Sequence, residues 1–417
     1  MPTPKAAPQA ARLTSIGVEN YKAIRLGGMV RLNPLTVCIG NNGSGKSSLL
    51  EAARTYQSVM WEGLDAAFAT ARGFEHVRNK RLPTDIKSAT KSTAIWLRMK
   101  ARLPGFLGHF DATLGINSTP AGNRVFIQEE TIDNKNSLCF DRNQTEGTLT
   151  LARANPGKSV AREWLGAAPF TEFVQRWQFV LLNPDVMGEP RAQSRIGGRT
   201  TLAVDGSNLA EYLLDLGERS PAAFEEVVEA MSYVLPYAAE VQPKLADDLE
   251  RRVYLELVES TPAKKNFRVP GWLFSTGTLR VLAIIALLKD PDPPPVIFIE
   301  EIENGLDPRT VGLVVDLLKE ATGAGRTQVI ATSHSPYLLD LLELEDLVLC
   351  QRDASGEPKF HRVGSDKALQ VWRKDFTPGK LYAMGRLQQM GSGLAKGEAP
   401  ATPHQPEGGW DDAEGDV

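Results

Sequence analysis

A glycine-rich octapeptide, GNNGSGKS at residues 40–47, constrains this chain more than any other feature. It follows a short apolar segment, 35–39, that is typical of a strand, and it opens a stretch that is typical of a helix, from Lys46 toward Ala66. The octapeptide matches the pattern G-x-x-x-x-G-K-[ST], whose glycines let backbone N–H groups turn inward around phosphate groups. The N-terminus of the following helix adds partial positive charge at the same place. The sequence therefore predicts a phosphate-binding turn rather than an ordinary glycine-rich turn.

The side chains of this turn predict a nucleotide and a metal ion as its ligands. We expect Lys46 to reach the β- and γ-phosphates of ATP and the Ser47 hydroxyl to ligate Mg²⁺. ATP and Mg²⁺ are therefore the expected cofactors. The residues expected to hold the nucleotide at this turn are Asn42, Gly43, Ser44, Gly45, Lys46, Ser47 and Ser48.

A second pattern, VIFIEE at residues 296–301, places two carboxylates directly after four apolar residues. In open α/β sheets ligands bind at the C-terminal ends of strands, which is where these acids would lie. We expect Glu300 to hold Mg²⁺ through water, and Glu301 to polarise the attacking water as a general base. The alternative is an acidic strand end that faces solvent, and the phosphate-binding turn makes that alternative the weaker one.

Two further motifs would complete such a site. Residues 274–280, FSTGTLR, open a strongly apolar helix, and Ser275 at this position is equally compatible with a plain helix N-cap. Residues 331–336, ATSHSP, follow a second buried strand at 328–332. A lone histidine is usually structural, but at this strand end we expect His334 to sense the γ-phosphate.

Length and composition exclude several classes of protein. The chain has 417 residues, of which 42% are hydrophobic and 24% charged, so it is neither wholly disordered nor collagen-like. Its longest apolar run, 281–288, is shorter than the roughly 20 residues of a membrane-spanning helix, and the N-terminus carries no apolar signal core. Cys38, Cys139 and Cys350 match no zinc or disulfide framework. We therefore expect a cytoplasmic protein with no membrane partner.

The apolar strands at 296–299 and 328–332 are typical of the buried centre of a parallel sheet. The segments 93–103, 124–129 and 148–152 are typical of antiparallel strands, and 251–259 is a further predicted strand. Amphipathic or apolar patterns predict helices at 207–216, 222–234 and 278–289. The predicted fold class is therefore α/β, with an antiparallel β subdomain and a helical lobe.

The order of these motifs resembles the ABC/SMC branch of P-loop ATPases. It runs from the phosphate-binding turn through S-x-G-x-x-R, the strand with its Glu-Glu pair and L-D-P at 306–308, to S-H-S-P at 333–336. The resemblance is closest to the compact RecF-like and OLD-like AAA-family ATPases of bacterial DNA repair and anti-phage defence. Three further segments resemble that group, namely its opening strand at 16–24, its D-G-S-N-L-A helix start within 202–214, and its closing segment at 375–381.

The resemblance implies how the remaining motif residues act. Such ATPases dimerise head to tail around two ATP molecules. Ser275 and Gly277 match the signature loop that contacts the γ-phosphate in the other protomer, and Asp307 matches a loop that communicates across the dimer. His334 matches the switch histidine, whereas Asn183 stands where the family often has a lid glutamine.

The resemblance also implies the organisation of the chain. Lobe I, a P-loop unit of the ABC-ATPase type found in SMC and RecF heads, would combine residues 13–180, which include a β-rich insert, with residues 290–385. A helical lobe II, residues 181–289, would carry the signature loop. Residues 1–12 and 386–417 are expected to form a flexible N-terminal tail and a disordered acidic tail.

These inferences lead to one expected function and two alternatives. We expect an ATP-hydrolysing switch that dimerises around ATP and controls a separate effector, a nuclease or toxin, or acts on DNA in anti-phage defence or DNA repair. A non-catalytic, ATP-dependent scaffold for a toxin or nuclease is one alternative, and the ATP-binding subunit of a transporter is the other. Residues 72–102 hold nine Lys or Arg against two acids, which is compatible with DNA contact but also with a solvated face.

Overall fold

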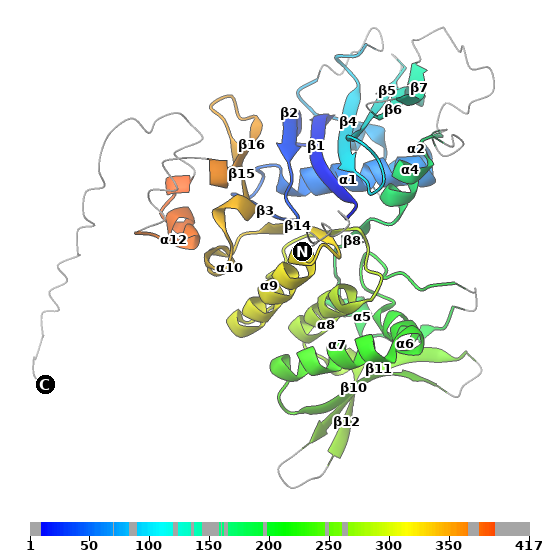
Figure 1. Ribbon diagram of the computed structural model, residues 1–417, viewed down its shortest axis with the longest axis vertical. Coiled ribbons are helices and arrows are strands. Elements are labelled where there is room, and N and C mark those ends of the chain that lie inside the picture. Colours follow the sequence, from blue (N-terminus) through cyan, green and yellow to red (C-terminus); the bar gives the residue numbers. More distant parts are fainter. Residues whose placement is uncertain are drawn as a thin grey trace, which may run out of the picture.

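Figure 1 shows the computed structural model of the chain. It describes residues 10–69, 71–82, 90–119, 124–134, 137–143, 158–159, 161, 166–194, 198–246, 250–260, 266–365 and 375–387. The strand predicted at 148–152 lies outside these residues, as do positions 1–9 and 388–417 of the two predicted tails.

The centre of the molecule is a mixed sheet of six strands. They are β3 (Leu35–Ile39), β8 (Gln178–Val180), β13 (Val296–Ile299), β14 (Gln328–Ser333), β15 (Leu347–Arg352) and β16 (Pro358–Arg362). Their order is β16-β15-β3-β14-β13-β8, and all neighbours pair in parallel except β16, which is antiparallel to β15. Strands β3, β14 and β13 are buried along their whole length, which explains why their sequences are mostly apolar rather than alternating.

Alternate residues of the central strands face opposite sides of this sheet. On one side Val296 and Phe298 share an apolar core with helix α1 (Lys46–Trp61) and with a second, antiparallel sheet. Helix α1 therefore lies between two sheets (Figure 1). The second sheet has the order β2-β1-β4-β5-β6-β7, with β1 (Arg12–Tyr21), β2 (Ile24–Arg31), β4 (Ile95–Arg102), β5 (Phe110–Ser118), β6 (Val125–Asn134) and β7 (Ser137–Asn143).

On the other side, Ile297 and Ile299 belong to a core that is built mainly from helices. The longer helices of this core are α6 (Leu209–Arg219), α7 (Pro221–Val234), α8 (Thr276–Lys289) and α9 (Pro308–Gly323). Helix α8 is apolar around its whole circumference because other helices surround it, and ten of its residues are buried. Below these helices in Figure 1 lies a small antiparallel sheet of β9 (Arg191–Ala192), β10 (Ala238–Leu245), β11 (Arg252–Ser260) and β12 (Asn266–Pro270).

A buried carboxylate holds the turn between α8 and β13. Asp290 is completely buried and accepts hydrogen bonds from the Tyr212 hydroxyl at 2.8 Å and from the Arg219 guanidinium at 3.0 Å. Arg199 pairs with the same carboxylate at 3.0 Å and also with Asp292 at 2.6 Å. The helical core and the central sheet are thus joined through one shared anchor.

The observed fold agrees with the predicted α/β class, and β13 and β14 occupy the two predicted central strands. The structure contains strands that the sequence patterns did not predict, namely β5, β7, β9, β10, β12, β15 and β16. Residues 181–289 accordingly contain β9–β12 in addition to the helices. The remaining helical elements are α2 (Leu64–Ala69), α3 (Phe74–Val77), α4 (Ala168–Gln175), α5 (Pro184–Met187), α10 (Pro336–Asp340), α12 (Pro378–Ala383) and the short 3-10 turns Gly271–Leu273, Leu344–Asp346 and Val363–Ser365.

Candidate functional site

Three neighbouring parallel strands end at the same edge of the central sheet, and each is followed by one of the predicted motifs. The phosphate-binding turn follows β3, the histidine motif follows β14, and the Glu-Glu pair follows β13. The strands are adjacent in that order, with Ser333 paired to Ile39 and Ala331 paired to Ile299. Parallel pairing therefore brings together motifs that lie almost 300 residues apart in the sequence.

The phosphate-binding turn depends on glycine at several positions. Gly43 and Gly45 have φ angles of +73° and +99°, in the left-handed region that other residues rarely adopt. A Cβ atom on Gly40 would lie 2.0 Å from the carbonyl oxygen of Cys350, so only glycine fits against this strand. Gly45 is also the N-cap residue of α1, which points the helix N-terminus at the turn.

Lys46 is buried beneath this turn. Its ammonium group donates hydrogen bonds to the carbonyl oxygens of Gly40 at 2.7 Å and Asn41 at 3.1 Å. Burial lowers the pKa of Lys46, and the nearby thiols of Cys350 and Cys38 and the acids Glu301 and Glu303 oppose this shift. The side chain is thus held by weak neutral acceptors that phosphate oxygens can replace. Ser47 is exposed beside it, and the buried Ser44 hydroxyl has no hydrogen-bond partner among the described residues.

Glu300 has the properties of a metal ligand. Its Oε1 atom is buried and has no hydrogen-bond partner among the described residues. Burial raises the pKa of Glu300 to about 7, and the neighbouring carboxylates of Glu51 and Glu301 add to the rise. Glu51 lies one helical turn beyond Ser47 on α1, so the first turns of α1 face Glu300. Carboxylate and hydroxyl oxygens are ligands that Mg²⁺ prefers, so these residues fit the expected ion.

The described part of the chain holds no group of three or more His, Cys, Asp or Glu residues able to bind a metal ion unaided. Magnesium in nucleotide sites usually takes only one or two protein ligands, with water and phosphate oxygens completing its shell. The single orphaned carboxylate oxygen of Glu300 therefore suits Mg²⁺ that is carried by a nucleotide.

Glu301 adopts a strained backbone conformation. Its φ angle of +47° is unusual for a residue other than glycine, and such strain typically costs about 1–3 kcal/mol. The Glu301 backbone N–H donates to the hydroxyl of the buried Thr332 at 2.9 Å, which holds the residue in place. The Asn304 amide approaches the Glu301 carboxylate at 3.4 Å. Glu301 is exposed, so its carboxylate is available to a bound ligand or water.

His334 is tied to an acid that the sequence patterns did not single out. The backbone N–H of His334 donates to Oε1 of Glu303 at 2.6 Å, whereas Oε2 of Glu303 is buried without a hydrogen-bond partner among the described residues. Burial lowers the pKa of His334, and the positive charge of Lys46 lowers it further. Glu303 is the third acid of the run 300–303, which is the signal that could have drawn attention to it.

The signature segment packs against the loop that follows β13. Ser275 is the N-cap of α8, and its hydroxyl accepts the backbone N–H of Thr278 at 3.0 Å. The capping alternative for Ser275 is therefore realised in the structure, and its contact with a second protomer stays a prediction. A Cβ atom on Gly277 would lie 2.2 Å from the carbonyl oxygen of Gly305, so backbone meets backbone here.

Two other predicted residues also act as helix caps. The Asp307 carboxylate accepts backbone N–H groups of Arg309 and Thr310 at the start of α9. The hydrogen bond from the Thr310 hydroxyl, followed by these backbone bonds, lowers the pKa of Asp307. The Asn183 side chain accepts the backbone N–H of Asp185 at 3.2 Å at the start of α5. The structure gives both residues local roles and leaves their predicted roles in nucleotide contacts as predictions.

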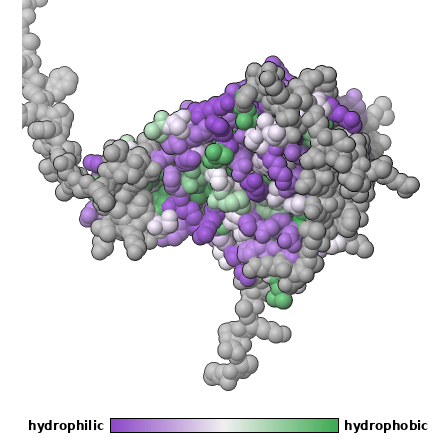
Figure 2. Space-filling view, turned by 90° about the horizontal axis from the view of Figure 1, so that it is seen from above, coloured by the Kyte–Doolittle hydropathy of each residue, from purple (hydrophilic) through white to green (hydrophobic). Residues whose placement is uncertain are grey.

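The basic stretch 72–102 carries less free positive charge than its sequence suggests. Acidic side chains outside the stretch pair with four of its cations, in the pairs Arg81–Glu357, Lys91–Glu129, Arg98–Glu19 and Lys100–Asp111. Arg78 is only 6% exposed, and Lys87 lies outside the described residues. The described surface seen from above is mainly hydrophilic, with apolar residues in small areas (Figure 2). These pairings favour the solvated-face interpretation of the stretch.

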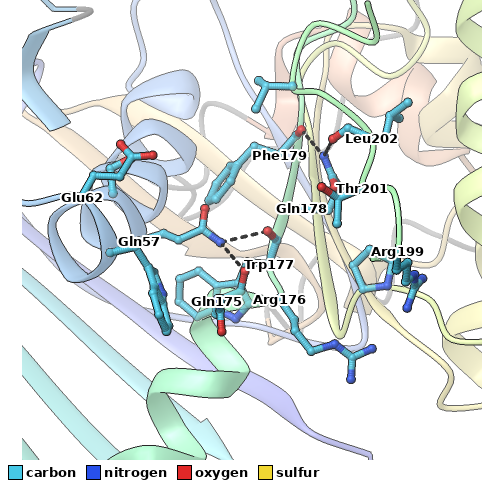
Figure 3. A pocket seen from close by; sticks show the side chains of 14 residues that line it. Gln57, Glu62, Gln175, Arg176, Trp177, Gln178, Phe179, Arg199, Thr201 and Leu202 are labelled. Carbon is cyan, nitrogen blue, oxygen red and sulfur yellow. Dashed lines mark hydrogen bonds between the residues drawn. The ribbon is translucent and has the colours of Figure 1, made fainter. Parts of the chain in front are cut away.

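A cavity of about 500 Å³ lies beside β8, away from the phosphate-binding turn. Figure 3 shows it between α1, which contributes Gln57, and the segment with Arg199 and Thr201. The Gln57 amide donates to the carbonyl oxygens of Val174 and Trp177 at 2.8 and 2.9 Å. No residue of the phosphate-binding turn, the Glu-Glu pair or the histidine motif lines this cavity, so it is not the candidate nucleotide site.

The chain is similar in sequence to proteins of known families. A family model described as "AAA domain, putative AbiEii toxin, Type IV TA system" matches residues 201–340. Over 205 residues, or 48% of the chain, the sequence is 27% identical to ABC transporter G family member 41 of Arabidopsis thaliana. The chain covers only 14% of that plant protein's length.

Solved structures of SMC heads share the fold. The SMC head bound to the C-terminal winged-helix domain of ScpA superposes with a TM-score of 0.55 at 14% sequence identity, covering 86% of this chain and 99% of that structure. An SMC head from Pyrococcus furiosus with an extended coiled coil, bound to the C-terminal domain of ScpA, gives a TM-score of 0.53 at 14% identity, covering 87% of this chain and 99% of that structure.

No helix within the described ranges is long and apolar enough to cross a membrane. The order of the motifs, their convergence at one edge of a parallel sheet, the family match and the shared SMC-head fold all lead to the same assignment. The chain has the fold of an ABC/SMC-type P-loop ATPase, and its residues 201–340 match the AAA domain family.

Proposed function

We propose that this protein binds and hydrolyses ATP, and that it works as a molecular switch which dimerises around the nucleotide. The convergence of Lys46, Glu300, Glu301 and His334 at one sheet edge is the observation that supports hydrolysis most directly. Electrostatic interactions link Lys46 to Glu301 and His334 to both, so these groups act on a common volume. A triphosphate in that volume would meet a cation, a general base and a γ-phosphate sensor together.

Phosphoryl transfer to water leaves the protein mainly with positioning and charge stabilisation. Lys46 would exchange its two carbonyl acceptors for phosphate oxygens, and Glu301 would take a proton from the attacking water. The Glu303 carboxylate accepts the backbone N–H of His334, and the Thr332 hydroxyl accepts the backbone N–H of Glu301, so both backbones are held in place. Mg²⁺, held by Ser47 and Glu300, would neutralise charge on the phosphates.

We infer a dimer because Ser275 begins α8, which packs on the face of the central sheet opposite to α1, the helix that follows the phosphate-binding turn. In the proposed head-to-tail dimer, Ser275 and Gly277 of one protomer complete the nucleotide site of the other, and Asp307 lies at the contact. Closure is driven by the higher affinity of ATP for the clamped state.

The proposed output is control of a separate effector protein, a toxin or nuclease, in anti-phage defence or DNA repair. The family match to a domain described for a toxin–antitoxin system supports a toxin-type partner. The SMC heads with the same fold are bound to domains of another protein, ScpA, which supports partner binding by such a fold. Direct action on DNA is the less supported form of the proposal, because the cations of the 72–102 stretch are largely paired.

Two substitutions separate binding from hydrolysis. Lys46→Ala removes the cation from the phosphate site and should abolish ATP binding, measured with a fluorescent ATP analogue and Mg²⁺. Glu301→Gln keeps the size of the side chain but removes the base, so ATP should still bind while phosphate release falls by roughly 10²–10⁴-fold.

Wild-type phosphate release by Glu301→Gln would refute the assignment of the base. Phosphate release by neither the wild type nor Glu301→Gln, with ATP binding intact, would support the non-catalytic scaffold instead. Glu225→Gln, which changes an exposed acid on α7, serves as the matched control.

A further inference from the structure

The phosphate-binding turn lies against the hairpin of β15 and β16. β15 is the neighbour of β3, the strand that leads into the turn (Figure 1). A Cβ atom on Gly45 would lie 3.1 Å from the Cβ atom of Pro358, the first residue of β16. On the β15 side, the carbonyl oxygen of Cys350 leaves no room for a Cβ atom on Gly40. Both strands of the hairpin therefore contact the turn, and the loop between them, residues 353–357, lies beside the candidate site.

Several hydrogen bonds hold loop 353–357 in place. The Asp353 carboxylate accepts the backbone N–H groups of Ser355 and Glu357, both at 2.9 Å. The Arg81 guanidinium donates to the carbonyl oxygens of Ser355 and Gly356, both at 3.1 Å. Arg81 also forms an ion pair with the Glu357 carboxylate. The loop is thus a firm support for a side chain that binds to it.

Arg352, the last residue of β15, links this loop to the phosphate-binding turn. Its Nε atom donates to the carbonyl oxygen of Gly43 at 2.9 Å, and its Nη1 atom donates to the carbonyl oxygen of Gly356 at 2.6 Å. A guanidinium group is planar and its donors have a fixed arrangement, so the two carbonyl groups are held in a defined orientation to each other. Because Arg81 binds the same Gly356 oxygen, the position of Arg352 is set by the loop.

The bond from Arg352 acts on a peptide group inside the turn. The carbonyl of Gly43 and the N–H of Ser44 belong to one planar peptide group, so fixing one fixes the other. The Ser44 N–H donates to the carbonyl oxygen of Asn41 at 3.2 Å, and this oxygen also accepts the Lys46 ammonium at 3.1 Å. Gly43, with a φ angle of +73°, has no side chain that could restrict its backbone. Arg352 thus supplies from outside the turn the restraint that this glycine lacks.

We propose that Arg352 is a positioning residue of the nucleotide site, which holds the Gly43–Ser44 peptide group and so keeps the phosphate-binding turn in its binding conformation. This inference rests on the proposed ATP-binding function. A turn that is ordered before the nucleotide arrives loses less conformational entropy on binding, so the guanidinium raises the affinity for ATP. Arg352 acts through the peptide group and needs no contact with the phosphates.

The Arg352–Gly43 contact can be tested without any nucleotide. Arg352→Gln removes the guanidinium, so the Ser44 amide should exchange its hydrogen with solvent about tenfold faster, near the lower end of the effect of losing a hydrogen bond from a charged group. Hydrogen–deuterium exchange of a peptide spanning residues 41–46 measures this change. Arg31→Gln, at the exposed last residue of β2, should leave the exchange at the wild-type rate. Equal exchange in Arg352→Gln and the wild type would overturn the contact.

Affinity for a fluorescent ATP analogue with Mg²⁺ tests the role in binding. Arg352→Gln should raise the Kd about tenfold, while its melting temperature stays near that of Arg31→Gln. Arg352→Lys keeps the positive charge but replaces the planar fork by one ammonium group, so it should also raise the Kd and accelerate the exchange at Ser44.

Two results would overturn the proposal. One is an unchanged Kd in Arg352→Gln. The other is wild-type affinity and exchange in Arg352→Lys, which would show that positive charge alone is needed at this position. If the wild type fails to bind the analogue, the proposed function itself is wrong, whereas hydrogen exchange still decides the Arg352–Gly43 contact.

Discussion

Replacing Glu300 by glutamine should make the nucleotide-free protein more stable at alkaline pH. In the folded chain the Glu300 carboxyl is partly buried, faces other acids and has a pKa of about 7, against an ordinary value of 4.5. As the pH rises from 4.5 toward 7, the Glu300 carboxyl loses its proton in the unfolded chain but keeps it to a larger extent in the folded chain. Stability contributed by the protonated group is therefore complete below pH 4.5 and is lost as the pH passes 7.

The size of this effect follows from the displacement of the pKa. A change from 4.5 to about 7 would amount to about 3 kcal/mol, because each pH unit corresponds to ~1.4 kcal/mol. Water screens a carboxylate that is only partly buried, so we expect about 2 kcal/mol between pH 5 and pH 8. Glu300→Gln cannot ionise and should lose this part of the pH dependence.

The assay is urea unfolding of wild type and Glu300→Gln in EDTA, at pH 5 and pH 8. The free energy of unfolding is compared between the variants at each pH, so that the contributions of all other titrating groups cancel. Glu225→Gln, which alters an exposed acid of α7, should follow the wild type at both pH values. The same pH dependence in Glu300→Gln and wild type, or a Glu300→Gln protein that is less stable at pH 8, would refute the reasoning.

Three other substitutions probe separate parts of the structure. Ser275→Arg should leave ATP binding intact but block ATP-dependent dimerisation, as measured by light scattering. Mixing it with Lys46→Ala protein should restore part of the hydrolysis. Normal hydrolysis by monomeric Ser275→Arg would contradict the dimer. Gly40→Ala forces a Cβ atom to within 2.0 Å of the Cys350 carbonyl oxygen, so it should abolish binding of the fluorescent ATP analogue while the circular dichroism spectrum is retained. Asp290→Ala removes a fully buried acceptor and should destabilise the protein by about 3 kcal/mol, read from the urea midpoint, and a change below ~1 kcal/mol would count against the anchor.

The central strands could be predicted because burial on both faces leaves a distinct pattern. A continuous apolar run such as β13, ending in two acids, identifies both the strand and the end at which the candidate site lies. Strands β5, β10 and β12 lack this pattern. β10 contains Pro243 and Lys244, and β12 has no fully buried residue, so local sequence gives little evidence that either pairs with β11.

The candidate site was predictable wherever a motif is contiguous in sequence. Glu303 was missed because its role depends on a neighbour, His334, that only the fold brings close. Cys38 and Cys350 appear unrelated in the sequence, yet they lie on the adjacent strands β3 and β15. Pairing between strands distant in the chain is the information that the sequence patterns did not contain.

The close approach of Gly277 to Gly305 has a consequence for timing between the two halves of the proposed dimer. Gly277 belongs to the segment that would complete the partner's site, and Gly305 follows the loop that carries the chain's own Glu301. Because the two backbones meet without intervening side chains, a displacement of one cannot be absorbed before it reaches the other. The charge of Glu301 also acts on Arg280, one turn further along α8. Each protomer would thus relay events between the two ATP molecules, and their hydrolysis should be cooperative rather than independent.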